Sequence, residues 1–278
     1  MKLSVIAPNN WMNQMKPELE KLGNEVLFND CSEDCDFLLG MSNSMNDQIE
    51  RFHYLYPKVP LITYNWDWYD LINKRVESWT RFIDLMKESK EVWSSSKTTA
   101  FKCEKETGIK SKHWFYAYIL PEEWEGEKKD GGYIIQASRN DWYKRFDWFD
   151  FAATELKIPH KAFHPKDNPR KEYIGAIKNC SFVVCCSLEE SIGTLSVMEG
   201  IYCRKPALIA DFDGATEVWG DAQDVVYFKK DDYEDLKTKM KWLWENKESI
   251  LRTSKKIVDE NFTPETFCKK INDRLLKI

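Results

Sequence analysis

Long apolar runs are missing from this chain of 278 residues, and the apolar stretch around Phe182 to Cys186 is only a few residues long. A helix that crosses a bilayer needs about 20 apolar residues, so the sequence predicts no transmembrane segment. The opening residues, MKLSVIAP, lack the long apolar core and the small-residue cleavage site of a signal peptide. They fit a first buried strand instead. We therefore expect a cytoplasmic protein, in the host cytoplasm if the gene is viral.

Metal-binding patterns are also missing. The four histidines have no metal-ligand spacing, and Cys31 and Cys35 have no matching cysteine pair downstream. Cys185 and Cys186 are adjacent within an apolar stretch, and the other four cysteines stand alone. Buried free thiols behave as small hydrophobes, and this interpretation of the eight cysteines is favoured over metal ligation. The sequence predicts no metal site.

The chain has no excess of positive charge. Its formal net charge of -5 excludes a global attraction to nucleic acid. Two local clusters of lysine and arginine are present, at Lys97, Lys102, Lys105, Lys110 and Lys112, and at Lys74, Arg75 and Arg81. Solvated helix faces are the favoured interpretation of these clusters, with a local basic surface as the alternative.

What the chain does have is a regular alternation of short apolar segments with helical patterns, which is typical of a parallel sheet covered by helices. The expected strands are 2–7, 25–28, 36–41, 59–64, 92–94, 112–116, 133–137, a segment near 160, 181–186, 207–210 and 225–228. The expected helices are 12–22, 46–56, 71–87, 98–107, 146–156, 195–202 and three segments within 233–276.

One segment interrupts this alternation. Residues 121–132, PEEWEGEKKDGG, are charged, rich in glycine and without periodicity, as is typical of a linker. The sequence therefore predicts an N-terminal Rossmann-like domain over 1–120 and a second Rossmann-like domain over 133–260. Residues 261–278 are expected to form a helix that packs back on the N-terminal domain.

The most informative stretch begins at Cys185 and reads CCSLEESIGTLSVMEGIYCRKPALIADFDGATEVWGD. It predicts a strand, a loop with Glu190 and Gly193, a helix from about Leu195, and a second strand. In an open parallel sheet such a loop lies at the carboxyl end of a strand, next to a helix N-terminus. Free backbone amides and the helix dipole favour anionic groups such as phosphates there.

This stretch resembles the donor-binding signature of GT-B glycosyltransferases, especially the retaining family 4 (glycosyl transferases group 1). The resemblance covers about residues 90–278, while the first ninety residues agree in pattern only. It implies an α/β protein of the GT-B fold, with two Rossmann-like domains and a cleft between them. It also implies a nucleotide diphosphate sugar, such as a UDP-sugar, as donor substrate, with no required cofactor.

The resemblance also implies roles for individual residues. Arg139 and Lys144, which follow the first strand of the second domain, match the cations that stabilise the departing diphosphate. Glu199 matches the glutamate that binds the ribose. Backbone amides of Gly193, Thr194 and Leu195 could cap the phosphates.

Glu190 matches the glutamate that orients the hydroxyls of the donor sugar, but the spacing departs from the family. Eight residues separate Glu190 from Glu199 where the family has seven. Either the loop carries an insertion, or Ser191 occupies the usual glutamate position and the sugar is recognised differently.

Two further segments of the sequence contain aspartates that could serve a site. Asp67, after the fourth expected strand, is either a general base or acceptor-orienting group, or equally a helix N-cap. The family often has a histidine near this position, and this chain has none. Asp211-Phe212-Asp213 looks like the metal-binding motif of GT-A enzymes, but it falls in a loop where GT-B enzymes have a turn near the sugar. The metal interpretation is therefore rejected.

The sequence thus predicts a glycosyltransferase that moves a sugar to a hydroxyl acceptor, by the resemblance with retention of configuration and without a metal. The acceptor is either a glycan or small molecule, or hydroxymethylated pyrimidine in phage DNA. A non-catalytic nucleotide-sugar-binding protein and a nucleotide-sugar epimerase are the alternatives. The identity of sugar, base and acceptor and the oligomeric state do not follow from the sequence.

Overall fold

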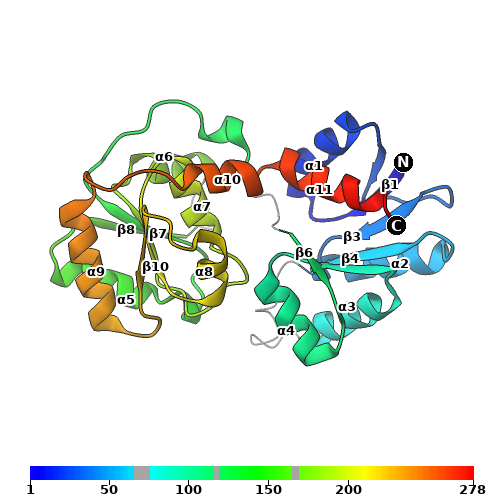
Figure 1. Cartoon of the computed structure of the whole chain (residues 1–278), viewed down its shortest axis with the longest axis horizontal. Coiled ribbons are helices and arrows are strands. Elements are labelled where there is room, and N and C mark those ends of the chain that lie inside the picture. Colours follow the sequence, from blue (N-terminus) through cyan, green and yellow to red (C-terminus); the bar gives the residue numbers. More distant parts are fainter. Residues whose placement is uncertain (66–75, 115–118, 165–168) are drawn as a thin grey trace. The chain divides into compact units, whose positions relative to one another are not determined.

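The computed structural model describes residues 1–65, 76–114, 119–164 and 169–278. These residues form two compact units, each built on its own parallel sheet (Figure 1). Unit 1 comprises Met1–Ala117 and Asn261–Ile278, and unit 2 comprises Tyr118–Glu260. Asp67, the candidate base, lies outside the described residues.

Unit 1 contains a six-stranded sheet in the order β2-β1-β3-β4-β5-β6, and every strand pair is parallel. The strands are β1 (Lys2–Ile6), β2 (Glu25–Phe28), β3 (Phe37–Gly40), β4 (Leu61–Asn65), β5 (Glu91–Ser94) and β6 (Lys112–His113). The helices are α1 (Asn9–Lys21), η1 (Asn43–Met45), α2 (Asn46–Leu55), α3 (Val76–Glu88), α4 (Lys97–Thr107) and α11 (Pro264–Leu275). Helices α1 and α11 lie on one face of the sheet, and α2, α3 and α4 lie on the other (Figure 1).

Local signals explain why these elements begin and end where they do. The Ser96 side chain accepts a hydrogen bond from the amide of Thr99 and so caps α4. Gly108 ends α4 with a φ of 75°, a conformation that glycine adopts without a steric penalty. Beneath α3 the buried aromatic rings of Trp79 and Phe82 meet edge to face at 5.9 Å.

The C-terminal helix α11 is fixed to unit 1 by apolar and polar contacts. Thr263 caps it, and Pro264 occupies its first turn. Asn24 Nδ2 donates to Asn272 Oδ1 at 3.0 Å, and Arg274 Nε donates to Glu91 Oε2 at 2.9 Å. The last helix of the chain therefore belongs to the same unit as the first strand.

Unit 2 contains a five-stranded parallel sheet in the order β11-β10-β9-β7-β8. The strands are β7 (Ile134–Ala137), β8 (His160–Phe163), β9 (Val183–Cys185), β10 (Ala207–Ala210) and β11 (Val225–Phe228). The helical elements are η3 (Pro121–Trp124), η4 (Trp142–Lys144), α5 (Phe146–Glu155), α6 (Arg170–Asn179), α7 (Leu195–Tyr202), α8 (Asp213–Trp219), α9 (Tyr233–Asn246) and α10 (Lys255–Asn261). Helices α5 and α9 cover one face of the sheet, and α6 and α7 cover the other (Figure 1).

Two helices of unit 2 were not expected from the sequence. Helix α6 follows Pro169, which occupies its N-cap position and fixes the backbone before the first turn. Helix α8 begins at Asp213, where a turn was expected. Gly214 permits this helix, because a Cβ atom there would lie 2.6 Å from the carbonyl oxygen of Glu190.

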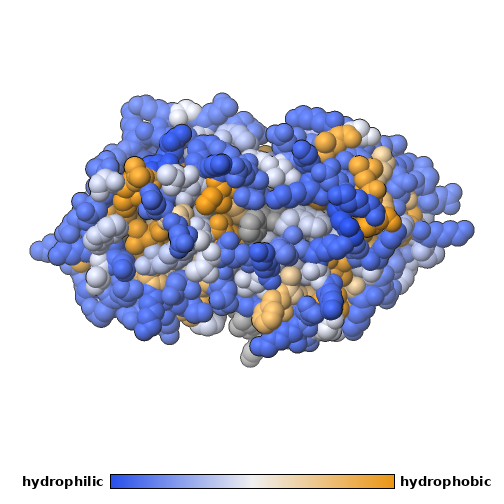
Figure 2. All heavy atoms as spheres, in the orientation of Figure 1, coloured by the Kyte–Doolittle hydropathy of each residue, from blue (hydrophilic) through white to orange (hydrophobic). Residues whose placement is uncertain are grey.

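The predicted fold class is confirmed: both units are parallel α/β structures, and the alternation of strands and helices follows the sequence pattern. All eight cysteines are buried, as expected of small apolar side chains. In the described part of the chain, no helix combines the length and apolar character required to cross a bilayer. On the face that Figure 2 shows, hydrophilic residues dominate, with smaller apolar patches between them.

Candidate functional site

The carboxyl ends of three neighbouring strands bring the predicted residues of unit 2 to one edge of its sheet. Strands β7 and β9 are adjacent, and β10 pairs with β9. Arg139 and Lys144 follow β7, and Glu190, Gly193 and Thr194 follow β9. In open parallel sheets this edge is the usual ligand-binding position.

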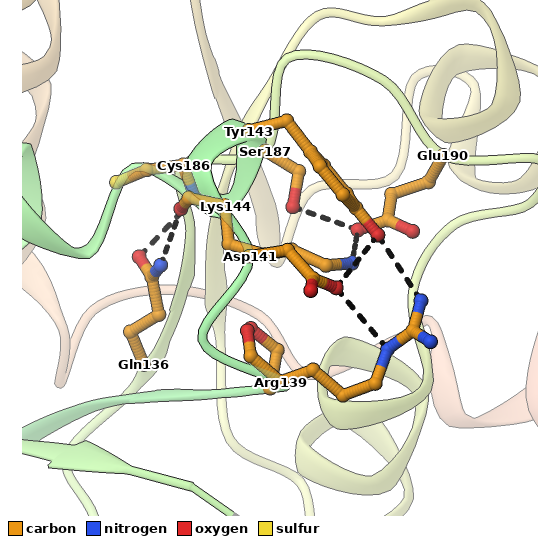
Figure 3. A network of polar contacts seen from close by, with 9 residues as sticks. Gln136, Arg139, Asp141, Tyr143, Lys144, Cys186, Ser187 and Glu190 are labelled. Atoms are coloured by element: carbon orange, nitrogen blue, oxygen red, sulfur yellow. Dashed lines mark hydrogen bonds and ion pairs between the residues drawn. The ribbon is translucent and has the colours of Figure 1, made fainter. Parts of the chain in front are cut away.

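Lys144 and Glu190 form the centre of this edge (Figure 3). The ammonium group of Lys144 donates to Glu190 Oε1, which also accepts a hydrogen bond from Ser187 Oγ at 2.7 Å. The pair is largely shielded from water, with 9% of the lysine side chain and 18% of the glutamate side chain exposed. An ammonium group has three donor hydrogens, so Lys144 can serve Glu190 and a further acceptor at once.

Backbone contacts hold the two loops of this pair together. Gln136, in β7, donates from Nε2 to the Lys144 carbonyl at 2.6 Å and accepts from the Cys186 amide at 3.3 Å. The amide of Leu188 donates to the Tyr143 carbonyl at 2.9 Å. The lysine and the glutamate are therefore positioned by the strand ends and not by their own contact alone.

Arg139 lies on the same edge in a second polar cluster (Figure 3). Its Nη2 donates to the Tyr143 hydroxyl at 3.1 Å, and its Nε lies 3.3 Å from Asp141 Oδ2. The Tyr143 hydroxyl in turn donates to Asp141 at 3.1 Å. Burial, together with the nearby Glu190 charge, raises the pKa of Tyr143, so the phenol stays protonated and remains a donor. The Arg139 side chain is 44% exposed, more accessible than Lys144.

The loop after β9 is tightly packed against α8. A Cβ atom on Gly193 would lie 2.4 Å from Trp219 Nε1, which donates to the Gly193 carbonyl at 3.2 Å. Glycine at both 193 and 214 therefore allows the loop and the helix to approach this closely.

Thr194, at the N-terminus of α7, has an unusual backbone. Its φ of 48° and ψ of 138° lie outside the regions that L-residues favour, which costs about 1–3 kcal/mol. Its Oγ1 is buried and has no hydrogen-bond partner among the residues that the structure describes. A strained residue with an unsatisfied hydroxyl at a helix N-terminus marks this position as a candidate ligand contact.

Glu199 lies on α7 and is completely buried. Its Oε1 accepts from Arg170 Nη1 at 3.0 Å, and its Oε2 accepts from the Tyr173 hydroxyl. Burial raises the pKa of the Glu199 carboxyl to about 7, while Arg170 and Tyr173 oppose that shift. The carboxyl group therefore changes its charge near neutral pH.

Arg170 connects Glu199 to a second carboxylate. Its Nη2 donates to Glu123 Oε2, in η3, at 2.6 Å. The guanidinium also lies 5.4 Å from the ring centre of Trp124 and 5.2 Å from that of Tyr173. The Arg170 side chain is 46% exposed, so it separates the Glu199 carboxylate from water.

The remaining predicted residues lie nearby with other contacts. Arg145, which directly follows Lys144 in the chain, pairs with Asp231 at 2.8 Å. Asp211, considered and rejected as a metal ligand, accepts from the Lys230 amide at 2.6 Å. Ser191 and Leu195 flank the loop that enters α7.

Several residues of this edge were not identified from the sequence. Each of them forms a hydrogen bond or belongs to a hydrogen-bonded cluster with a predicted residue. They are Asp141, Tyr143, Ser187, Arg170, Tyr173 and Trp219. One signal was available, because Glu199 is embedded in the apolar helix LSVMEGIY. A carboxylate in such a helix needs buried donors, although the sequence alone does not say which.

Comparisons with known proteins find a family match within unit 2. Residues 143–259 match the family model of Glycosyl transferases group 1. A relative from Campylobacter jejuni, N,N'-diacetylbacillosaminyl-diphospho-undecaprenol alpha-1,3-N-acetylgalactosaminyltransferase, is 25% identical over 205 residues. That match covers 62% of this chain and 54% of the relative, so the chain matches about half the length of this curated protein.

Solved structures share the whole architecture at low sequence identity. Anabaena Alr3699/HepE in complex with UDP-glucose matches with a TM-score of 0.76 and 11% identity, over 100% of both chains. Sucrose-phosphate synthase from Thermosynechococcus elongatus matches with a TM-score of 0.77 and 9% identity, over 100% of this chain and 98% of the other. The solved structures show that this chain has the α/β fold of GT-B proteins, and residues 143–259 resemble the family Glycosyl transferases group 1.

Proposed function

We propose that the protein transfers a sugar from a nucleotide diphosphate sugar to a hydroxyl acceptor, with the donor bound at the carboxyl edge of the unit 2 sheet. The observation that carries this proposal is the pairing of Lys144 with Glu190 between the ends of β7 and β9. Lys144 is a cation suited to the diphosphate of such a donor, and Glu190 is a carboxylate suited to the hydroxyls of its sugar. The diphosphate needs positive charge, and the sugar hydroxyls need an acceptor.

Arg139 and Lys144 stabilise the leaving diphosphate in this proposal. Lys144 keeps one donor hydrogen on Glu190 and offers another to a phosphate oxygen. Arg139 is accessible and presents a planar guanidinium, which binds phosphate oxygens in pairs. The N-terminal amides of α7 and the Thr194 hydroxyl complete the phosphate site, since the helix dipole adds positive potential there.

Glu190 orients the hydroxyls of the donor sugar. Its Oε1 already accepts from Lys144 and Ser187, so the second carboxylate oxygen is available for a sugar hydroxyl. We propose that Glu199 binds the ribose and that the departing phosphate accepts the acceptor proton. The transfer would then retain the anomeric configuration.

The reaction is proposed to need no metal, because fixed cations supply the charge that a metal ion would otherwise provide. Within the described residues, no three histidine, cysteine or carboxylate side chains are grouped to hold a metal ion. Several of the structural neighbours are complexes with UDP or UDP-glucose, which supports a UDP-sugar as the proposed donor.

For the acceptor, we favour a glycan or another small hydroxyl compound over phage DNA. Two of the cations in the basic clusters of unit 1 are neutralised by carboxylates. Arg81 pairs with Glu50 and Asp47, and Lys112 pairs with Glu91. Binding to DNA requires cations that are available to phosphates and weakens steeply with salt. Salt-independent transfer to a glycan, with no binding to hydroxymethylated DNA at low salt, is therefore expected.

A donor-cleavage assay tests the proposal. The protein is incubated with a panel of UDP-sugars, and released UDP and free sugar are measured with and without a metal chelator. One sugar should be released slowly, with the chelator having no effect. NMR of the first product should show the donor's anomeric configuration.

The same assay separates the alternatives. A protein that binds UDP but cleaves no donor is a non-catalytic binder. Conversion of a UDP-sugar to its epimer identifies an epimerase. Binding of neither UDP nor any UDP-sugar contradicts the proposed donor site.

A further inference from the structure

Glu199 cannot accept a hydrogen bond from a ligand in the conformation described here. Its side chain has 0% of its surface exposed, so no lone pair of the carboxylate is accessible to a ribose hydroxyl. Both carboxylate oxygens already have donors, Arg170 on Oε1 and Tyr173 on Oε2. One of these two donors must move before a nucleotide can reach the carboxylate.

The two donors differ in their freedom to move. Tyr173 is buried within α6, and its ring packs edge to face against Trp124 at 6.4 Å. Arg170 lies on the first turn of the same helix, with 46% of its side chain exposed. A long, half-exposed side chain changes rotamer far more readily than a buried aromatic ring. Arg170 is therefore the group that can uncover Glu199.

Arg170 also has a second carboxylate that can hold it after such a movement. Its Nη2 donates to Glu123 at 2.6 Å while its Nη1 donates to Glu199 at 3.0 Å. The Glu123 side chain is 30% exposed and lies on η3, outside the helix that carries Glu199. A guanidinium with five donor hydrogens can keep the bond to Glu123 and release the one to Glu199.

We propose that Arg170 is a latch over the ribose site, whose guanidinium leaves Glu199 and stays on Glu123 when a nucleoside diphosphate binds. This inference rests on the proposed function, in which Glu199 binds the ribose. The ligand class is a nucleotide with free ribose hydroxyls, since only those hydroxyls replace the guanidinium on the carboxylate. Arg170 acts on the nucleotide through Glu199, so it is a positioning residue.

The apparent affinity for the nucleotide is proportional to the fraction of molecules in which the latch is open, so a mostly closed latch weakens binding. Removing the guanidinium should therefore strengthen binding of UDP, whereas removing its second partner should weaken it. Arg170→Ala opens the Glu199 carboxylate to water. Glu123→Gln removes one of the two carboxylates that Arg170 contacts among the described residues, so that Glu199 is the carboxylate that remains. The two variants should change the affinity in opposite directions.

Isothermal titration calorimetry at pH 8.5, above the pKa of Glu199 in the wild type, measures both effects. Arg170→Ala should bind UDP about 5-fold more tightly than the wild type, and Glu123→Gln about 2-fold more weakly. The matched ligand is 2′,3′-dideoxyuridine diphosphate, which lacks the hydroxyls and should bind all three proteins alike. The wild type and Glu123→Gln can be compared even if Arg170→Ala folds poorly.

The outcomes separate the latch from the proposed function. UDP binding that is unchanged or weaker in Arg170→Ala, or unchanged in Glu123→Gln, overturns the latch and leaves the donor site standing. The same gain with UDP and with the dideoxy ligand also overturns it, because the hydroxyls would then play no part. Absence of UDP binding in all three proteins overturns the proposed donor site, and the latch with it.

Discussion

The two units differ in the polar side chains that they bury. Among the described residues, the polar side chains buried in unit 1 are all uncharged. They are Ser4, Asn24, Ser42, Asn46, Thr63, Asn65, Ser94, Ser95, Ser96 and Thr99. In unit 2 the buried polar residues include the charged side chains of Lys144, Glu199, Lys205 and Asp224. Burying a charge is costly unless it is paired, so a protein retains such a residue where the charge has a task.

The position of the buried charges within unit 2 separates two tasks. Lys144 lies at the carboxyl edge of the sheet, paired with the partly buried Glu190 in the candidate site. Lys205 and Asp224 precede β10 and β11, at the opposite edge, and bond to the backbone of Lys129 and Ser254. We infer that the first pair serves an anionic ligand and that the second group serves stability.

The largest effect on donor turnover is expected from replacing Lys144, one of the two buried lysines of unit 2. Lys144→Met should lower donor turnover about 100-fold, since it removes a charge that stabilises the leaving group. It should also lower the free energy of unfolding by about 3 kcal/mol, because it leaves Glu190 unpaired. Donor cleavage and urea unfolding measure the two effects.

The matched control for that variant is Lys205→Met, which removes a buried ammonium group from the opposite edge of the same sheet. It should reduce stability and leave turnover per folded molecule unchanged. Equal losses of turnover in the two variants would contradict the division of unit 2 into a ligand edge and a structural edge.

Glu199 should make stability depend on pH in unit 2. Its pKa is raised from an ordinary value of 4.5 to about 7, so its contribution to stability is complete below pH 4.5 and is lost as pH rises through 7. Glu199→Gln cannot ionise. Between pH 4 and pH 8 the wild type should therefore lose roughly 3 kcal/mol more than this variant in urea unfolding. Parallel pH profiles would show that burial does not hold back the ionisation of Glu199.

A smaller effect is expected from the strained backbone at the N-terminus of α7. Thr194→Gly should raise the free energy of unfolding by about 1 kcal/mol, because glycine adopts a positive φ without strain. It should also weaken UDP binding, since it removes the unpaired Thr194 hydroxyl. Lys157→Gly, at a φ of 55° outside the site, is the control and should change stability alone. If UDP affinity is unchanged in Thr194→Gly, the hydroxyl has no part in the phosphate site.

The smallest effect on the donor is expected from a charge pair in unit 1. The Arg274 guanidinium, with Lys112 and Trp93, lowers the pKa of Glu91 to about 2. This pair stabilises the protein above pH 4.5, and the contribution is lost as pH falls through 2. Arg274→Met should therefore be less stable than the wild type at pH 7, by an amount that shrinks towards pH 2. UDP affinity should stay the same. A change in UDP affinity would contradict the assignment of the donor site to unit 2 alone.

Much of the fold follows from the sequence, because the spacing of apolar residues distinguishes its strands, which are short apolar runs, from its amphipathic helices. Strand β2 and helix α7 begin and end where the pattern predicts. Helix α6 was missed because its ten residues have only a short apolar stripe, and α8 because its Asp-Gly start is typical of a turn.

The candidate site was predictable in its position but not in its contacts. The strand ends place Lys144 and Glu190 together, as any parallel sheet would. That Lys144 is buried, and that Arg170 covers Glu199, depends on contacts between residues that are 46 and 29 positions apart in the chain. A single sequence contains no signal for such pairs.

The most direct test of the account compares two neighbouring arginines. UDP and UMP are titrated into the wild type, Arg139→Met and Arg145→Met. Arg139 donates to the Tyr143 hydroxyl at the carboxyl edge of the sheet, while Arg145 pairs with Asp231. We expect Arg139→Met to lose at least about 10-fold in UDP affinity, with a smaller loss for UMP, and Arg145→Met to bind both ligands like the wild type. If Arg139→Met binds UDP as the wild type does, the diphosphate is not held at this edge of the sheet.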